Sequence, residues 1–174
     1  MTPTQLWQHA LDRIPVLLIK DKALQERYLR DTLNLYSQEA GVLRTLKTSA
    51  SSFAIPPHFL DINSCYDHDG SWCHAVIQND QILIEFGTVP FDFHYFINLY
   101  AWELNSELPL NIETGLLIDY LERLLGEANA LKLALTKAVQ LDLEGKTPAE
   151  YAQQKERIVE QMKQKSIPFD VLIL

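Results

Sequence analysis

The longest helical periodicity in the chain lies in residues 112–141, which read IETGLLIDYLERLLGEANALKLALTKAVQL. Apolar residues recur there at intervals of three and four, the spacing that places side chains on one face of an α-helix. The members of this stripe are Leu116, Leu117, Tyr120, Leu121, Leu124, Leu125, Leu131, Leu135, Ala138 and Leu141 or Val139. The spacing predicts a long amphipathic helix. Gly126 lies in its middle, where we expect a kink or a break because glycine weakens helices.

A second helix is predicted directly after this one. The first run stops at Glu144-Gly145, and Thr147-Pro148-Ala149-Glu150 follows. The threonine can cap the new helix, and the proline suits its first position. The glutamate can reach back to the N–H of the capping residue. The signal predicts a helix that extends through Tyr151 to Lys165.

Two further helices are expected before residue 42. Residues 21–39 are amphipathic, Asp21 is a suitable N-cap, and Ala40-Gly41 ends the pattern. A shorter helix is predicted from Thr4 to Leu11. Between them, residues 14–19 form an apolar run interrupted by a proline, which disfavours a central strand or a helix interior. We interpret that run as an arm that lies on the chain's own core or against another subunit.

Residues 42–100 change to the period of two that is typical of strands. The clearest case is residues 91–100, where aromatic residues occupy alternate positions. Asp69-Gly70 predicts a tight hairpin between the strand that ends at Tyr66 and a return strand over 72–77. A turn at 78–80 and a strand over 81–86 follow. Together they predict an antiparallel meander of four or five strands.

These elements predict the α+β class, in one domain of 174 residues. A small antiparallel β meander is flanked by helices, with extended N- and C-terminal arms. The expected parts are an N-terminal arm over 1–20, a helix over 21–41, the meander over 42–100, a helical part over 111–165, and a C-terminal strand or arm over 166–174. The last four residues are all apolar, so this strand is expected to pair with the chain's own sheet or to join a partner's sheet edge.

The charge is concentrated in one segment. The net charge is −8, and residues 61–110 contain no Lys or Arg but eight Asp or Glu. Such a segment is unsuited to generic nucleic-acid binding, because phosphate contacts need cations. It suits either a solvated acidic face or an acidic surface for a basic protein partner. Two cysteines are too few for a disulfide framework, and no apolar run of membrane-spanning length or secretory signal is seen.

One cluster contains residue types that bind metals or act in catalysis. Its members are Cys65, Asp67, His68, Asp69, Cys73 and His74. Their spacing fits neither the common zinc patterns nor a calcium loop. A cysteine nucleophile would need a histidine base, for which His74 or His94 is available. We expect a polar hairpin tip, with no catalytic residue, no metal and no cofactor. Trp7, Trp72 and Trp102 are expected in the core or an interface rather than in a ligand cleft.

The order of these elements resembles that of a known family. A helix ends in Leu33-Asn34-Leu35-Tyr36-Ser37, and a strand with Ile55-Pro56-Pro57 follows. The meander then closes with the strand from Phe91 to Leu99, and helices end the domain, the last rich in Lys, Glu and Gln over 151–165. This order resembles the head–tail connector, or adaptor, proteins of tailed bacteriophages. The resemblance covers most of residues 21–165.

The resemblance implies a non-enzymatic virion structural protein at the head–tail junction, assembled in the host cytoplasm. Its partners would be further copies in a homo-oligomeric ring, the portal protein, and a tail or neck component. DNA would touch the channel wall passively, without sequence-specific binding, and no membrane would be involved. Both arms would suit contacts between subunits. The expected interface residues are Ile14, Val16, Leu17, Leu18, Ile19, Phe169, Val171, Leu172, Ile173 and Leu174.

Two alternatives stay open from the sequence. The first is a small cytosolic, immunity-type binding protein whose acidic middle segment meets a basic partner. The second is a metal-dependent enzyme that uses the cluster between Cys65 and His74.

Overall fold

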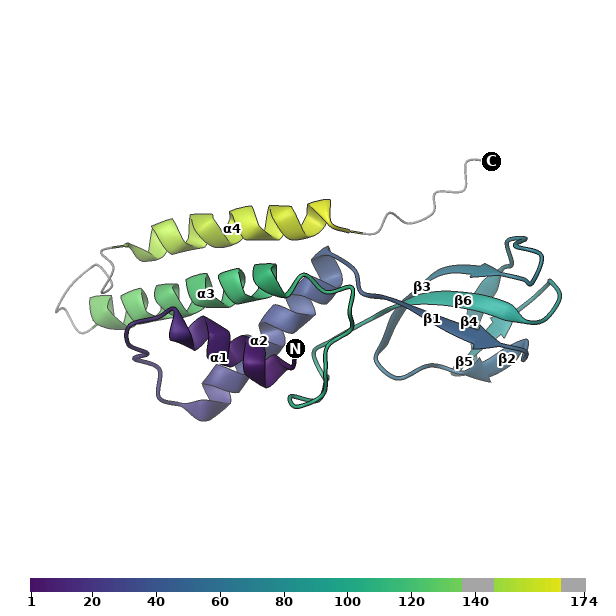
Figure 1. Cartoon of the computed structure of the whole chain (residues 1–174), viewed down its shortest axis with the longest axis horizontal. Coiled ribbons are helices and arrows are strands. Elements are labelled where there is room, and N and C mark those ends of the chain that lie inside the picture. Colours follow the sequence, from purple (N-terminus) through teal and green to yellow (C-terminus); the bar gives the residue numbers. More distant parts are fainter. Residues whose placement is uncertain (136–145, 167–174) are drawn as a thin grey trace. The chain divides into compact units, whose positions relative to one another are not determined.

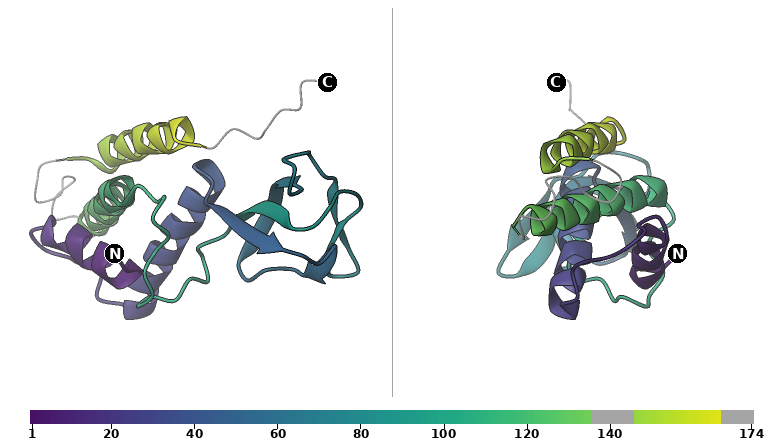
Figure 2. Two further views of the ribbon diagram at one scale, coloured as in Figure 1. Left: turned by 45° about the vertical axis from the view of Figure 1, so that its right-hand side comes forward. Right: turned by 90° about the vertical axis from the view of Figure 1, so that its left-hand side faces the viewer.

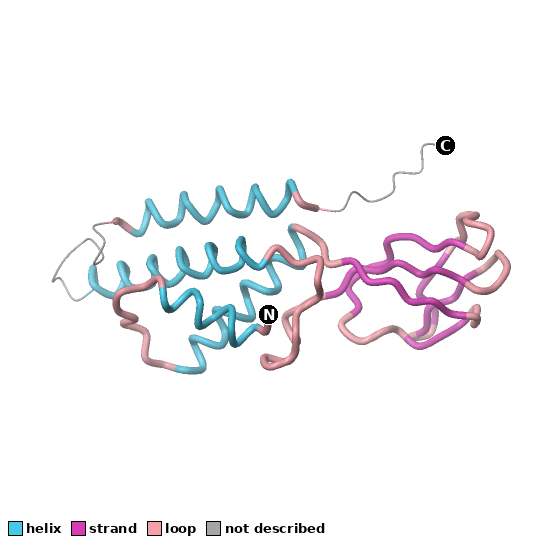
Figure 3. The backbone as a smooth tube through the Cα atoms, in the orientation of Figure 1, coloured by secondary structure: helices cyan, strands magenta, loops and turns pink. Residues whose placement is uncertain are grey.

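The computed structural model of the chain describes residues 1–135 and 146–166. The elements in these ranges are α1 (Pro3–Asp12), α2 (Lys22–Glu39), β1 (Leu43–Thr48), β2 (Ser52–Ala54), β3 (Phe59–Tyr66), β4 (Ala75–Gln78), β5 (Gln81–Ile84), β6 (Phe91–Ile97), α3 (Thr114–Leu135) and α4 (Pro148–Gln164). Helices and antiparallel sheets occupy separate parts of the chain (Figure 3), so the predicted α+β class is confirmed.

The contacts divide the chain into two compact units. The helical unit comprises Met1–Ala40 and Leu99–Ser166, and the β unit comprises Gly41–Asn98 among the described residues. The β unit is therefore an insertion between α2 and α3. The prediction of one domain stays a prediction, because units defined by contacts can fold together or separately. The predicted C-terminal strand and the end of the 112–141 stripe lie outside the described residues.

The predicted helix starts are confirmed. Thr147 and Glu150 form a reciprocal capping box at α4, where the Glu150 N–H donates to Thr147 Oγ1 over 3.3 Å and the Thr147 N–H donates to Glu150 Oε2 over 2.7 Å. Asp21 caps α2 by accepting hydrogen bonds from the N–H groups of the first turn. The chain leaves α2 through Gly41 at φ +72°, a conformation that favours glycine.

The centre of the helical unit is α3, which contacts α1, α2 and α4. Its buried residues are Leu117, Ile118, Leu121, Leu125, Gly126, Asn129 and Ala130. The two long helices α3 and α4 lie side by side and antiparallel in both Figure 1 and Figure 2. Near one end of the pair Lys165 faces Glu113 over 3.6 Å, and in the middle of the pair Lys155 forms an ion pair with Glu127.

The predicted break at Gly126 is wrong, because α3 continues through this residue as one helix. A Cβ atom at Gly126 would lie 2.5 Å from the ring of Tyr151, which is buried on α4. The glycine therefore serves the packing of two helices. A sequence pattern cannot separate this role from a kink, because both place glycine within a helix.

An extended N-terminal arm is not confirmed, because residues 14–19 run along α3. Asn129 holds this segment: its Oδ1 accepts the Leu18 N–H over 2.9 Å and its Nδ2 donates to the Val16 carbonyl over 2.8 Å. Ile19 is buried, whereas Val16 is 47% exposed. Of the two placements expected for this run, the segment adopts the one on the chain's own core, and its use as an interface stays a prediction.

The β unit consists of two three-stranded antiparallel sheets, with strand orders β1-β6-β3 and β2-β5-β4. Their side chains meet in a common core of Cys65, Cys73, Ile82, Ile84, Phe91 and Phe93. The Phe53 ring from one sheet packs edge-on against the Phe93 ring of the other, with centroids 5.3 Å apart. The predicted turn at 78–80 is confirmed as the β4–β5 hairpin, in which Asn79 and Asp80 have positive φ.

The predicted single meander is wrong in its strand order. β4 pairs with β5 as expected, but β3, which was expected to pair with β4 as a hairpin around Asp69-Gly70, pairs with β6 instead. Of the expected hairpin, the turn at Asp69-Gly70 and a short stretch beside it are present, with a bridge between Tyr66 and Trp72 and a hydrogen bond from the Asp67 N–H to the Ser71 carbonyl over 2.9 Å. The chain changes sheets after this bridge because Cys73 enters the core between them. Local turn chemistry is compatible with both topologies, so the long-range core decides between them.

Candidate functional site

The segment from Cys65 to His74 is divided between the core and the surface. Cys73 donates its N–H to the Cys65 carbonyl over 2.8 Å, and both side chains are buried in the β-unit core. Burial, together with the neighbouring Cys73 thiol, raises the pKa of Cys65 to about 12. Burial also raises the pKa of Cys73. Both thiols therefore stay protonated near neutral pH, the form that is poor as nucleophile and metal ligand.

The two candidate histidine bases bind other groups. His74 Nδ1 lies 2.7 Å from Glu85 Oε2, and His94 Nδ1 lies 2.8 Å from Thr45 Oγ1. The side chain of His74 is 47% exposed, whereas Cys73 beside it is buried, so the two side chains point to opposite sides of the backbone. The cluster seen in the sequence is thus not one site in the structure.

Asp67 organises the turn at the tip of the β unit. Its Oδ1 accepts the N–H groups of Asp69 over 3.0 Å and Ser71 over 2.9 Å. Its Oδ2 accepts from both the N–H and the Oγ1–H of Thr88, each over 3.4 Å. Partial burial raises the pKa of Asp67, but these hydrogen bonds outweigh it and the net pKa is lowered. Asp67 therefore ties the 67–71 turn to the segment after β5.

A group of possible metal ligands is formed by Asp67, His68 and Asp69, whose ligand atoms lie within 4.8 Å of one another. His68 Nε2 is 3.0 Å from Asp69 Oδ1, and His68 Nδ1 is 2.9 Å from Thr88 Oγ1. The Asp67 carboxylate is directed to backbone N–H groups. These contacts support the turn and leave few free ligand positions for a metal ion.

Three aromatic rings lie exposed in a row beside this turn. The ring centroids of Trp72 and His74 are 5.9 Å apart, and those of His74 and Phe86 are 6.5 Å apart, with the latter pair stacked. Trp72 is 47% exposed and Phe86 is 63% exposed. We call Trp72, His74 and Phe86 the aromatic row. Exposed contiguous apolar surface of this kind marks interaction sites in soluble proteins.

The backbone explains how the aromatic row forms. Glu85 donates its N–H to the His74 carbonyl over 3.0 Å, which extends the β4–β5 ladder by one pair and places Glu85 opposite His74. Phe86 lies beyond the end of β5, and its ring stacks on the His74 ring. Trp72 and His74 are two residues apart. Their side chains share a side because successive side chains of an extended backbone point to alternate sides. Gly87 then allows the chain to pass Cys73, since a Cβ at Gly87 would lie 2.5 Å from the Cys73 sulfur.

From the sequence, Trp72 was expected in the core or in an interface, and the aromatic row was not predicted. The spacing of Trp72 and His74 was a usable signal for one shared face. Phe86 could not be assigned to it from the sequence, because Phe86 lies beyond the end of β5, where strand alternation no longer fixes the side of a residue. The charge pattern of the sequence did indicate acidic residues in this part of the chain. Glu85, Asp67 and Asp69 all belong to the segment without Lys or Arg.

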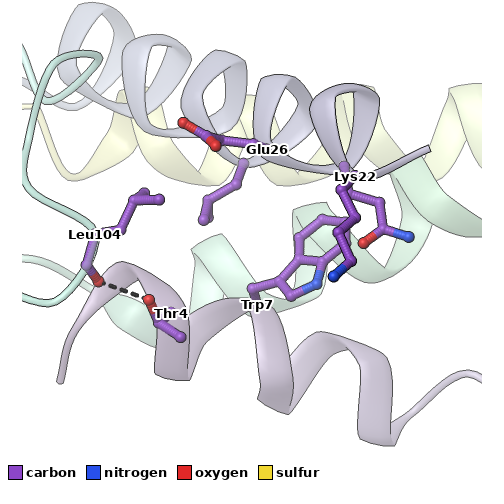
Figure 4. A pocket seen from close by; sticks show the side chains of 7 residues that line it. Thr4, Trp7, Lys22, Glu26 and Leu104 are labelled. Atoms are coloured by element: carbon purple, nitrogen blue, oxygen red, sulfur yellow. Dashed lines mark hydrogen bonds between the residues drawn. The ribbon is translucent and has the colours of Figure 1, made fainter. Parts of the chain in front are cut away.

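The helical unit carries a separate cleft of about 220 Å³. Figure 4 shows Trp7 of α1 facing Lys22 and Glu26 of α2, with Leu104 at one side. Thr4 Oγ1 donates to the Leu104 carbonyl over 2.9 Å, and this hydrogen bond links α1 to the loop at one side of the cleft. The lining is mainly apolar, and Glu26 is already bonded to Arg30 Nε over 2.8 Å. This cleft offers a small apolar surface and a single cationic side chain.

Comparisons with known proteins do not assign the chain to a family: no protein-family model matches it, and no curated protein matches it significantly. Within residues 1–135 and 146–166, no helix is long and apolar enough to cross a membrane.

Proposed function

We propose that this chain is a non-enzymatic structural adaptor, a head–tail connector of a tailed bacteriophage. In this proposal, copies of the chain form a ring between the portal protein and a tail or neck component. The observation that carries the proposal is the order and closure of the elements. The helices that precede the β unit in the sequence and those that follow it form one helical unit, in which α3 contacts α1, α2 and α4. This is the element order on which the resemblance rests.

Exposed apolar side chains on the helical unit support the use of this unit in assembly. Val16 is 47% exposed, Leu131 49%, Leu135 83%, and Leu110 is fully exposed. Val16 belongs to the predicted interface segment. The Asn129 side chain holds the backbone of Val16 in place by donating a hydrogen bond to its carbonyl. A fixed apolar residue binds a neighbouring subunit at a lower entropic cost than a mobile one.

The charge of the β unit supports passive contact with DNA. In Gly41–Asn98 the cations are Arg44 and Lys47, both on β1, and Lys47 already faces Asp92 over 3.2 Å. A surface dominated by carboxylates repels phosphate groups, so DNA would pass without binding. This property suits a channel wall or a surface directed towards protein partners.

Localisation in particles tests the proposal. An antibody raised against the chain is used to label purified phage particles from the source organism for electron microscopy. A single band of label at the head–tail junction is expected. Absence of the chain from clean particles, measured by mass spectrometry of their proteins, would reject the connector proposal.

The C-terminal segment offers a variant for the same experiment. We predict that replacing Leu172 and Ile173 with Asp abolishes incorporation into particles while the chain stays folded. Circular dichroism of the purified variant provides the folding control. A variant that incorporates normally would contradict the role of the C-terminal strand, and a variant that unfolds would place that strand in the chain's own core.

A second candidate function is a small protein-binding module of the immunity type. The aromatic row beside Asp67, Asp69 and Glu85 favours it, because such a surface suits a single basic partner. Sedimentation distinguishes the two functions. A monomer that forms a one-to-one complex and never enters particles supports the binding module, whereas a ring at the head–tail junction supports the connector.

A further inference from the structure

We infer that the aromatic row is a docking surface for arginine side chains of a protein partner. Trp72, His74 and Phe86 provide the ring faces, and Glu85, Asp67 and Asp69 provide the negative charge. This inference concerns partner chemistry and holds whether the protein is a connector or a smaller binding module. It therefore fails or succeeds independently of the particle experiment.

The exposure of the rings shows that the β-unit core does not use them. The core is formed by Cys65, Cys73, Ile82, Ile84, Phe91 and Phe93. Trp72 and Phe86 lie outside this cluster, 47% and 63% exposed. Burying a tryptophan or a phenylalanine side chain is favourable, so the exposure of these two rings leaves much of that free energy for a partner. Tryptophan is also among the residues that most often dominate binding at protein interfaces.

The aromatic row is fixed in place before any partner binds. Asp67 accepts N–H groups from Ser71, directly before Trp72, and from Thr88, two residues after Phe86. His68 adds a bond from its N–H to the Thr88 carbonyl over 3.3 Å. Glu85 bonds to the His74 ring over 2.7 Å. Both backbone segments that carry the rings are thus linked, which lowers the entropy lost on binding.

The charge around the aromatic row determines the kind of partner. Within the β unit, residues 61–98 contain no Lys or Arg and six acidic residues, so no cation of this segment competes for the ring faces. A guanidinium group stacks on aromatic rings and donates hydrogen bonds to carboxylate oxygens. Both oxygens of Asp67 are already bonded within the turn, so the acceptors are Glu85 and Asp69, each of which contacts a histidine through one oxygen. Rings spaced about 6 Å apart, with Glu85 bonded to the His74 ring, fit this planar group better than an ammonium group, which is a compact, strongly hydrated charge.

Nuclear magnetic resonance of the full-length chain tests the inference. The probe is a capped peptide with two arginines separated by glycine, and its twin has lysines in the same positions. We expect the arginine peptide to shift the Trp72 indole N–H and the amides of His74, Glu85 and Phe86. We also expect it to bind several-fold more tightly than the lysine peptide at equal ionic strength.

Variants of single residues measure how much each ring contributes to binding of the arginine peptide. Trp72→Ala and Phe86→Ala are each expected to weaken binding of the arginine peptide about tenfold, the loss of a ring contact together with its apolar contact. Tyr100→Ala is the matched control, because Tyr100 is an exposed aromatic residue on the helical unit, 45% exposed. This control should bind the peptide like the wild type. Trp72→Phe, which keeps a ring, is expected to retain most of the affinity and covers the case in which Trp72→Ala does not fold.

Three results would overturn the inference. Equal binding of the arginine and lysine peptides would show attraction by net charge alone. Shifts that spread over the acidic residues but leave the aromatic row unchanged would place the contact elsewhere. Shifts of the aromatic row that grow with protein concentration, in the absence of peptide, would identify a second copy of the chain as the occupant.

Discussion

Gly126 provides the sharpest test of the packing in the helical unit. Replacing a glycine inside a helix with alanine usually stabilises a protein, because alanine loses less backbone entropy and favours the helix by about 1 kcal/mol. In α3 we predict the opposite sign. A Cβ atom at position 126 would lie 2.5 Å from two ring carbons of Tyr151 and 2.9 Å from its hydroxyl oxygen.

The magnitude follows from two opposing effects. Tyr151 is 3% exposed, so its ring has little room to move away. Forcing a methyl group into a filled contact typically lowers the free energy of unfolding by about 1–3 kcal/mol. Subtracting the gain in helix propensity leaves an expected net loss of about 1 kcal/mol, and up to about 2 kcal/mol, for Gly126→Ala.

Urea denaturation followed by helical circular dichroism measures this change. Gly115→Ala is the matched control, since Gly115 lies in the same helix and no atom lies within 4 Å of a Cβ at that position. This control should be neutral or stabilising by up to about 1 kcal/mol. The pair Gly126→Ala and Tyr151→Ala completes a double-mutant cycle, in which alanine at position 126 should become stabilising once the ring is removed.

The result that refutes this reasoning is a stabilising Gly126→Ala in the wild-type background. If alanine raises the free energy of unfolding equally with and without the Tyr151 ring, the close approach of α3 and α4 at this position does not exist in solution. A loss of similar size at both Gly126 and Gly115 would instead point to a general effect of helix substitution.

Three further predictions concern other contacts. Asn129→Ala should lower the free energy of unfolding by about 2 kcal/mol, because two backbone groups lose a partly buried partner, and hydrogen exchange at the Leu18 amide should accelerate. Gly41→Ala should lower stability by at least about 1 kcal/mol in urea denaturation, since φ is +72° and a Cβ would lie 2.9 Å from the Phe96 ring. The raised pKa of Cys65, about 12 against an ordinary value of 9.0, implies stability that is complete below pH 9 and is lost as the pH rises towards 12. Urea midpoints measured across that range should therefore fall more steeply for the wild type than for Cys65→Ala.

The helical elements were largely predictable from the sequence. The caps at Asp21 and Thr147 are local, because a side chain and an N–H within three residues form them. The stripe along α3 is also local, since a period of 3.6 is read directly from neighbouring residues. The role of Gly126 was not predictable, because it depends on Tyr151, which is 25 residues away and reaches α3 only through tertiary packing.

The positions of the strands were predicted better than the pairing between them. Most strand positions in 52–97 were identified, and so was the β4–β5 hairpin, but the pairing of β3 with β6 was not. The aromatic row illustrates the consequence for function. Trp72 and His74 share a side through local alternation, whereas Phe86 lies beyond the end of β5 and joins them only through the tertiary path of the chain.

The sequence by itself determined the α+β class, the starts of the helices, the turn at 78–80 and the concentration of negative charge in 61–110. Each of these depends on residues close together in the chain or on composition alone. Only the tertiary structure decided that two sheets form instead of one meander, that Cys65 and Cys73 are buried while His74 is exposed, and that three aromatic rings line up beside carboxylates. The physical reason is that pairing and burial depend on contacts between distant residues, and many pairings are compatible with the same local pattern.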